Sequence, residues 1–134
     1  MSGAQNTKVV REAYAAFGRG DIAALLEMMA DEIHWQPVIG TANYVPFSGA
    51  RTGKASVAEF FKRVAETEDF QQFEPRELVA QGDTVVAIGS YRATAKATGR
   101  TFESDFVMVF TFRNGRVVAF REFTDSAAIN AAFA

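Results

Sequence analysis

Cysteine is absent from this 134-residue chain, and histidine occurs once. Without cysteine the protein forms no disulfide and has neither a thiol nucleophile nor a thiolate metal site. The single histidine, His34, has no second imidazole with which to share a metal ion, so we expect no metal and no cofactor. His34 can shuttle protons, but a lone histidine beside a helix-to-strand junction is more often simply hydrogen-bonded.

Strong charge and long apolar runs are also lacking. The formal net charge is −2 and no basic block stands out, so we expect no binding to nucleic acid. No apolar run is long enough to cross a membrane, and the polar start MSGAQNTK lacks the apolar core of a signal peptide. We therefore expect a soluble, cytoplasmic protein that does not interact with membranes.

Phenylalanine, in contrast, is abundant. The chain has 13 phenylalanines, and 49% of its residues are apolar. This composition predicts an ordered fold, and the length suits one domain with one core. A core so rich in phenylalanine can line a large apolar cavity as well as fill one.

Apolar residues at helical spacing come first along the chain. They predict three helices, at about 9–17, 22–29 and 57–64. Asp21 can cap the second helix, and Ser56 with Glu59 fits a capping box for the third. Between the second and third helices we expect a short strand at 33–37 and a loop at 38–53.

From Phe70 onward the pattern alternates. It predicts four strands, at 70–80, 84–97, 101–112 and 116–124, with turns at Gly82-Asp83, Thr98-Gly99 and Asn114-Gly115, and then a short helix at 126–133. Helices followed by a meander of strands indicate an α+β fold.

The inward face of the last strand depends on the preceding turn. In the strand at 101–112 the even-numbered residues form the core face. A two-residue loop, Asn114-Gly115, would put odd-numbered residues of the next strand inside, and a three-residue loop, 113–115, would put even-numbered residues inside. The residues alone slightly favour the shorter loop.

Three segments carry a resemblance that covers nearly the whole chain. They are VREAYAAFGRGDIAALLEMMADEIHW, SGARTGKASVAEFFKRV and AQGDTVVAIGSYRATAKATGRTFESDFVMVFTFRNGRVVAFREFTD. Their pattern resembles the SnoaL-like branch of the nuclear transport factor 2-like superfamily, which includes ketosteroid isomerases, limonene epoxide hydrolases and polyketide cyclases. The resemblance implies a single domain over 1–134, in which a cone-shaped, curved antiparallel sheet wraps around the N-terminal helices and encloses a pocket, commonly in a homodimer.

The resemblance also implies which residues line the pocket. In such folds the last strand contributes pocket residues at positions matching Phe120, Glu122 and Thr124, which favours the three-residue loop. A three-residue loop at 98–100, assumed in the same way, puts Ser90 and Arg92 on the same inward face as Glu122. The backbones of Arg92 and Glu122 would then lie about 10 Å apart. We predict Glu122 and Arg92 as catalytic residues, and a purely structural ion pair is the alternative.

The chemistry at Glu122 depends on its partner. A carboxyl inside an apolar cone has a raised pKa if alone and a lowered pKa beside a cation, and it serves as general acid or general base accordingly. Limonene epoxide hydrolases use an Asp-Arg-Asp set, but here Ser90 and Arg92 stand where Arg and Asp are expected. Ketosteroid isomerases place a base before a proline and an acid in an oxyanion hole. Here Gln36 precedes Pro37, and Met108 replaces that acid, so neither mechanism carries over.

Aromatic residues supply most of the predicted ligand-binding set. It comprises Tyr14, Phe17, Trp35, Gln36, Tyr44, Phe60, Ser90, Phe106, Met108 and Phe120. Trp35 and His34 lie on opposite faces of their strand, and the sequence does not decide which points inward; we favour Trp35 as a pocket wall. As a set, these residues suggest a small apolar ligand.

Three functions remain open from the sequence. The first is a small cofactor-independent enzyme, an isomerase, cyclase or hydrolase, acting on an apolar or aromatic substrate. The second is a non-catalytic module that binds a hydrophobic ligand, and the third is a dimeric interaction scaffold. The outer face of the strand at 101–112, with Val107 and Val109 beside Phe123, is too apolar for solvent and predicts a homodimer interface. The identity of the ligand is not determined by the sequence.

Overall fold

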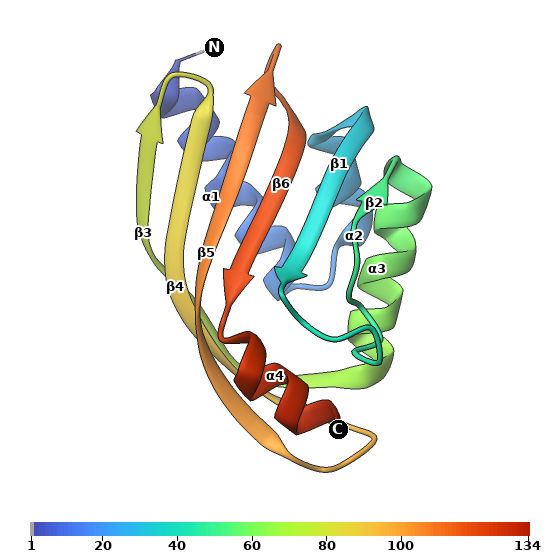
Figure 1. Ribbon diagram of the computed structural model, residues 1–134. Helices are drawn as coiled ribbons and strands as arrows, with labels where there is room; N and C mark the ends of the chain where they lie inside the picture. The colour runs from blue at the N-terminus through green and yellow to red at the C-terminus, as the bar shows by residue number, and fades with distance from the viewer. Residues whose placement is uncertain (1) are drawn as a thin grey trace.

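The computed structural model describes residues 2–134 and contains a six-stranded sheet and four helices within that range (Figure 1). The helices are α1 (Gly3–Gly18), α2 (Ile22–Glu27), α3 (Lys54–Thr67) and α4 (Ser126–Phe133). The strands are β1 (Met29–Ile39), β2 (Arg51–Thr52), β3 (Glu68–Gln81), β4 (Thr84–Ala95), β5 (Thr101–Arg113) and β6 (Arg116–Thr124).

The sheet has the strand order β2-β1-β6-β5-β4-β3. β1 and β6 run parallel, and every other neighbouring pair is antiparallel. Figure 1 shows the long strands bending around α1, with α3 beside β1 and β2 and with α4 below the end of β6. The sheet is curved but does not close, and the helices cover its concave side. The predicted α+β fold is therefore confirmed.

The helix starts show which capping signals act. The carboxylate of Asp21 accepts a hydrogen bond from the Ala24 N–H at 3.1 Å, so its predicted capping role is confirmed. The predicted capping box at Ser56 and Glu59 is wrong, because α3 begins earlier, after Gly53, and has no side-chain cap. Gly53 has a φ of 88°, a conformation that favours glycine, and this sharp entry moves the helix start ahead of Ser56.

The connection between β4 and β5 does not have the predicted length. Its last strand pair is Thr94 with Thr101, so residues 95–100 form the turn instead of a three-residue loop at 98–100. Within it the Gly99 N–H donates to the Ala95 oxygen at 2.8 Å. Odd-numbered residues of β4 therefore lie opposite even-numbered residues of β5. The connection is three residues longer than predicted, and any odd-numbered change moves every side chain of a strand to the other face, so Ser90 and Arg92 lie on the outer face of the sheet.

The turn between β5 and β6 is the two-residue loop, and the predicted three-residue loop is wrong. Arg113 pairs with Arg116, and both Asn114 and Gly115 have positive φ, at 52° and 78°. These values are typical of a hairpin turn that matches the strand twist.

A β-bulge at the start of β6 nevertheless restores the predicted face. Phe112 pairs with Val117, whereas Thr111 pairs with Ala119, so one extra residue of β6 is inserted at that point. Beyond the bulge Phe120 and Glu122 are buried, and Arg121 is exposed. The even-numbered face of β6 therefore points inward, as predicted, but for a different reason.

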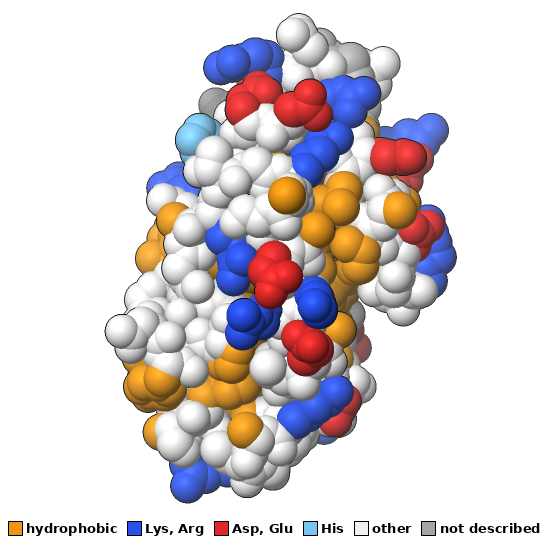
Figure 2. Space-filling model, turned by 90° about the vertical axis from the view of Figure 1, so that its right-hand side faces the viewer, with side chains coloured by type: hydrophobic (Ala, Val, Ile, Leu, Met, Phe, Trp, Pro, Cys, Tyr) orange, Lys and Arg blue, Asp and Glu red, His pale blue; other side chains and the backbone are white. Residues whose placement is uncertain are grey.

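The surface that carries α3 mixes both charge signs. Figure 2 shows acidic and basic side chains interspersed over this face, without an extended patch of one sign. Among residues 2–134, no helix combines the length and the apolar character needed to cross a membrane.

Candidate functional site

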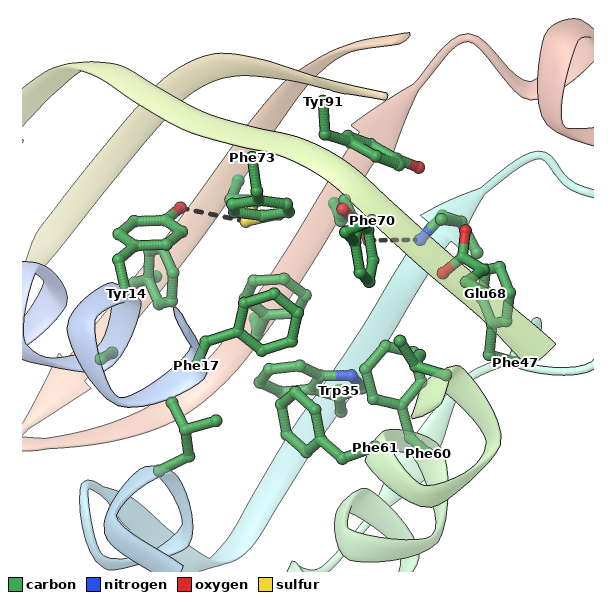
Figure 3. A pocket seen from close by; sticks show the side chains of 18 residues that line it. Tyr14, Phe17, Trp35, Phe47, Phe60, Phe61, Glu68, Phe70, Phe73 and Tyr91 are labelled. Atoms are coloured by element: carbon green, nitrogen blue, oxygen red, sulfur yellow. Dashed lines mark hydrogen bonds between the residues drawn. The ribbon is translucent and has the colours of Figure 1, made fainter. Parts of the chain in front are cut away.

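A cavity of about 90 Å³ lies between the helices and the concave side of the sheet (Figure 3). Side chains from α1, α2, α3 and five strands surround it. They are Ala13, Tyr14, Phe17, Leu25, Trp35, Val38, Phe47, Phe60, Phe61, Val64, Glu68, Phe70, Phe73, Tyr91, Met108, Phe110, Phe120 and Glu122. The wall is almost entirely apolar, and its two ionisable carboxyl groups belong to Glu68 and Glu122.

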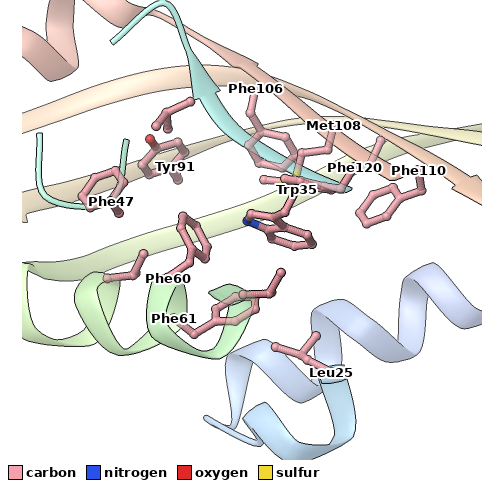
Figure 4. Packing of buried hydrophobic residues seen from close by; sticks show 14 of the residues in the cluster. Leu25, Trp35, Phe47, Phe60, Phe61, Tyr91, Phe106, Met108, Phe110 and Phe120 are labelled. Atoms are coloured by element: carbon pink, nitrogen blue, oxygen red, sulfur yellow. The ribbon is translucent and has the colours of Figure 1, made fainter. Parts of the chain in front are cut away.

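Stacked rings make one wall of the cavity rigid. The rings of Trp35 and Phe120 stack with centroids 3.8 Å apart, across the parallel pair of β1 and β6 (Figure 4). Phe60 and Phe61 of α3 approach the indole from the other side, each with its centroid at 5.5 Å. Large rings held in this way keep their positions, so the cavity has a defined shape.

Glu122 points from β6 into this apolar space. Its side chain is 6% exposed, and it stands opposite Met108 of β5. The Val38 N–H donates to its Oε1 at 3.1 Å. Burial raises the pKa of Glu122 from 4.5 to about 7, although the hydrogen bond from Val38 acts in the opposite direction. The carboxyl group is therefore close to half ionised at neutral pH.

The backbone at Val38 is strained where it meets Glu122. Val38 has a φ of 40°, which a β-branched residue rarely adopts. The pairing of β1 with β6 is irregular there, between Gln36 and Ile39. Such a conformation costs about 1–3 kcal/mol and is typical of functional sites. Here it directs a backbone N–H toward the Glu122 carboxyl group.

Glu68 brings a second carboxyl group to the cavity. It is the first residue of β3, directly after α3, and its side chain is 5% exposed. Its Oε1 has no hydrogen-bond partner among residues 2–134. Burial, and then the nearby charge of Glu122, raise its pKa from 4.5 to about 8. Glu68 is therefore mostly protonated at neutral pH and can donate a proton.

Two tyrosines stay neutral beside these acids. Burial, and then Glu122, raise the pKa of both Tyr14 and Tyr91, and Glu68 adds to the effect at Tyr91. The Tyr14 hydroxyl donates to the Met108 sulfur at 3.0 Å (Figure 3). Both phenols therefore act as neutral hydrogen-bonding groups.

The predicted pair of Glu122 and Arg92 does not form. Arg92 lies on the outer face, where its Nη2 is 2.6 Å from Oε1 of Glu103, and both side chains are largely exposed. The cause is the connection between β4 and β5, which is three residues longer than predicted and so reverses the faces of β4. Among residues 2–134, no ion pair involves Glu122. Its charge is therefore not balanced by a neighbouring cation.

The structure brings part of the predicted ligand-binding set together at the cavity. Six of its members line the wall beside Glu122: Tyr14, Phe17, Trp35, Phe60, Met108 and Phe120. The inward position favoured for Trp35 is confirmed, and His34 is exposed on the opposite face.

Four predicted ligand-binding residues lie elsewhere. Gln36 is exposed, because it alternates with the buried Trp35 along β1. Ser90 is on the outer face with Arg92. Tyr44 is 52% exposed, and its hydroxyl donates to the Asn130 oxygen at 3.1 Å. Phe106 is fully buried behind the cavity wall, stacked on Phe73 at 5.2 Å.

Sequence reasoning missed Glu68. The predicted strand began at Phe70 and the apolar pattern of the predicted helix ended at about residue 64, so Glu68 fell between the two. The signal that could have found it is its spacing: Glu68 and Phe70 are two residues apart and share a face once β3 starts earlier. Phe70, Phe73 and Tyr91 also line the cavity without having been predicted as ligand-binding residues.

Comparison with protein families identifies the chain. The SnoaL-like domain family matches residues 10–120. The chain belongs to this family. Proteins provisionally named as an isomerase and as a polyketide cyclase have the same nuclear transport factor 2-like fold. No curated protein matches the chain.

Several solved structures are similar to this SnoaL-like protein over nearly their whole length. A nuclear transport factor 2-like protein from Burkholderia xenovorans LB400 has 34% identity and a TM-score of 0.89, with coverage of 100% of this chain and 99% of that one. TerC, co-crystallised with polyporic acid, has 28% identity and a TM-score of 0.82, with coverage of 96% and 98%. A protein from Rhodopseudomonas palustris, provisionally named an isomerase, has 25% identity and a TM-score of 0.76, with coverage of 96% and 95%.

Proposed function

We propose that this SnoaL-like protein is a cofactor-independent enzyme of the isomerase or cyclase type, in which Glu122 acts as the general base on a small aromatic substrate. The observation that carries the proposal is the buried Glu122 carboxyl group, which faces an aromatic cavity without a neighbouring cation. A general base works best when its pKa lies near the working pH, and burial raises the pKa of Glu122 to about 7.

The reaction class follows from the groups available. Isomerisation and cyclisation of carbonyl compounds both involve loss of a proton from the carbon next to the carbonyl group. Glu122 is the group that would accept this proton. The strained Val38 N–H holds one carboxyl oxygen, and so orients the other for the transfer.

The size of the cavity limits the substrate. Its volume of about 90 Å³ is below that of a cavity of about 150 Å³ that binds benzene, and well below the range for drug-sized ligands. A substrate with a single aromatic ring therefore suits the site, after a small outward movement of flexible side chains such as Met108.

Proton exchange tests the proposal without knowledge of the natural substrate. Phenylacetone carries one ring and acidic protons next to a carbonyl group, and their exchange in heavy water is followed by proton NMR. The expected result is catalysed exchange that rises with pH through about 7 and falls at least about 100-fold in Glu122→Gln.

The control is Glu103→Gln, which removes a carboxylate from the outer face of the same sheet. It should leave the exchange rate unchanged. Exchange by Glu122→Gln at the wild-type rate would refute the role of Glu122. Binding of the ketone without any exchange would instead identify a non-catalytic binding module.

A further inference from the structure

Glu68 is a buried carboxyl group that the proposed reaction does not use. It lies at one end of the cavity, and Figure 3 shows it beside Phe47, with Tyr14 at the opposite end. Its Oε1 has no hydrogen-bond partner among residues 2–134. A buried, unpartnered carboxyl group destabilises the fold, so its presence in the cavity wall indicates a ligand that pairs with it.

The surroundings of Glu68 contain negative and neutral groups only. Glu122 faces it from β6, and Tyr91 faces both acids from β4. No lysine, arginine or histidine is among the described residues that line the cavity. Lys96 follows Ala95, the strand partner of Glu68, but its Nζ lies 3.7 Å from Oδ1 of the neighbouring Asp69, where both side chains are largely exposed.

Aromatic faces complete the site. Rings from α1, α3, five strands and the loop that holds Phe47 surround the cavity, including those of Phe17, Phe60, Phe70 and Trp35. Aromatic faces attract ammonium groups, and the attraction strengthens where water is excluded. A carboxyl group at one end of such a set of rings combines the two features that recognise an organic cation.

We propose that the cavity binds an aromatic ligand with a protonated amine, whose ammonium group pairs with Glu68 while its ring lies among the aromatic side chains. The inference rests on the proposed function for the reaction at Glu122, and it adds the class of substrate. The amine occupies the Glu68 end of the cavity, and Glu122 stays available to accept the proton.

The ionisation of the two acids predicts how binding depends on pH. The pKa values of about 7 for Glu122 and about 8 for Glu68 mean that the pair carries roughly one negative charge between these values. A monovalent cation neutralises that charge, whereas a carboxylate ligand adds to it. Amine affinity therefore rises as the pH increases from 6 to 8, by up to about 50-fold for pairing with one carboxyl group whose pKa is about 8, as for Glu68.

Three ligands of similar size separate charge from shape. Benzylamine, benzyl alcohol and benzoate each carry one ring and differ mainly in charge. Trp35 is the only tryptophan of the chain and lines the cavity, so its fluorescence reports binding directly. At pH 8 we expect benzylamine to bind at least tenfold more tightly than benzyl alcohol, and benzoate to bind most weakly.

Two variants locate the selectivity. Glu68→Gln keeps the shape of the side chain and removes its charge, and it should lower the ratio of amine to alcohol affinity several-fold, while the charge of Glu122 remains in the cavity. Glu103→Gln, on the outer face, should leave the ratio unchanged. Four results would each overturn the inference. They are equal binding of amine and alcohol, tighter binding of benzoate than of the amine, no binding of any ligand at millimolar concentration, and an unchanged ratio of amine to alcohol affinity in Glu68→Gln.

The two proposals fail in different ways. If Glu122→Gln loses proton exchange but the wild type does not prefer the amine, the catalytic role of Glu122 is supported and the amine site at Glu68 is rejected. An amine preference that depends on Glu68, without any exchange by the wild type, supports the amine site and rejects the catalytic role.

Discussion

Raising the pH from 5 to 8 should destabilise this protein. Its two cavity carboxyl groups keep their protons in the folded state over part of this range, whereas the same two groups lose their protons in the unfolded state. In the unfolded state both glutamates have a pKa near the ordinary 4.5, and in the fold Glu122 has a pKa of about 7 and Glu68 of about 8. Within this window the folded state binds more protons than the unfolded state. Stability therefore falls as the pH rises.

The expected loss is large relative to the stability of a small domain. Each such group lowers the free energy of unfolding by about 1.4 kcal/mol per pH unit between its unfolded and folded pKa values. Both groups contribute between pH 5 and pH 7, which gives a loss of about 5 kcal/mol, against a typical total of about 5–15 kcal/mol. Above pH 7 the contribution of Glu122 levels off, and that of Glu68 continues to about pH 8.

Urea unfolding at pH 5, 6, 7 and 8, followed by circular dichroism, measures this dependence. Glu122→Gln should about halve the slope between pH 5 and pH 7, and the double variant with Glu68→Gln should be nearly independent of pH there. Both single variants should be more stable than the wild type at pH 8, because an amide has no proton to lose. A wild-type slope of zero, of the opposite sign, or equal to that of the double variant would show that the two carboxyl groups do not keep their protons in the folded state.

Three further predictions concern the sheet. Gly89→Ala should severely lower the thermal unfolding temperature, because the new β-carbon would lie 2.1 Å from a backbone oxygen of β3. The matched control is Gly18→Ala, which should change that temperature little, because nothing lies within 4 Å of its new β-carbon. Arg92→Gln should cost less than about 1 kcal/mol in urea unfolding because its pair with Glu103 is exposed, and a loss of several kcal/mol would contradict the outward position of Arg92. We expect a homodimer, because apolar residues are exposed on the outer face of β5 and β6. Light scattering should show this dimer for the wild type and a monomer for Phe123→Glu. A monomeric wild type would reject this interface.

The positions of helices and strands were largely predictable because they depend on local patterns. Apolar spacing placed α1, α2 and α3, and alternation placed β4, β5 and β6 to within two residues. β1 is longer than predicted, since Met29, predicted on the second helix, begins the strand. A short apolar stretch at a helix-to-strand junction fits both periodicities, so the boundary depends on tertiary packing.

The face that each strand turns inward was less predictable, because it depends on turn lengths and bulges. A longer turn moved Arg92 outward, and nothing further along β4 reversed the change. In β6 the shorter turn should have moved Glu122 outward, but the bulge near Val117 reversed it. A change of one or three residues in a turn is a small local difference with a large effect on the site. Patterns in the sequence do not show where such a residue is inserted.

The candidate site was therefore predicted only in part. Glu122 and six of its aromatic or apolar neighbours could be placed from strand alternation and from the family resemblance. Glu68 could not, because its role depends on the start of β3, and Val38 could not, because its strained φ follows from the irregular pairing of β1 with β6.

The ionisation of Glu122 shows directly whether this buried carboxyl group lacks a neighbouring cation. Carbon-13 NMR of protein labelled at the glutamate carboxyl groups follows each group as the pH changes, and comparison with Glu122→Gln assigns the signal. We expect a midpoint near pH 7 for Glu122. A midpoint near the ordinary value of 4.5 would mean that a cation or water stabilises the charge, and would contradict the proposed role of Glu122 as the general base.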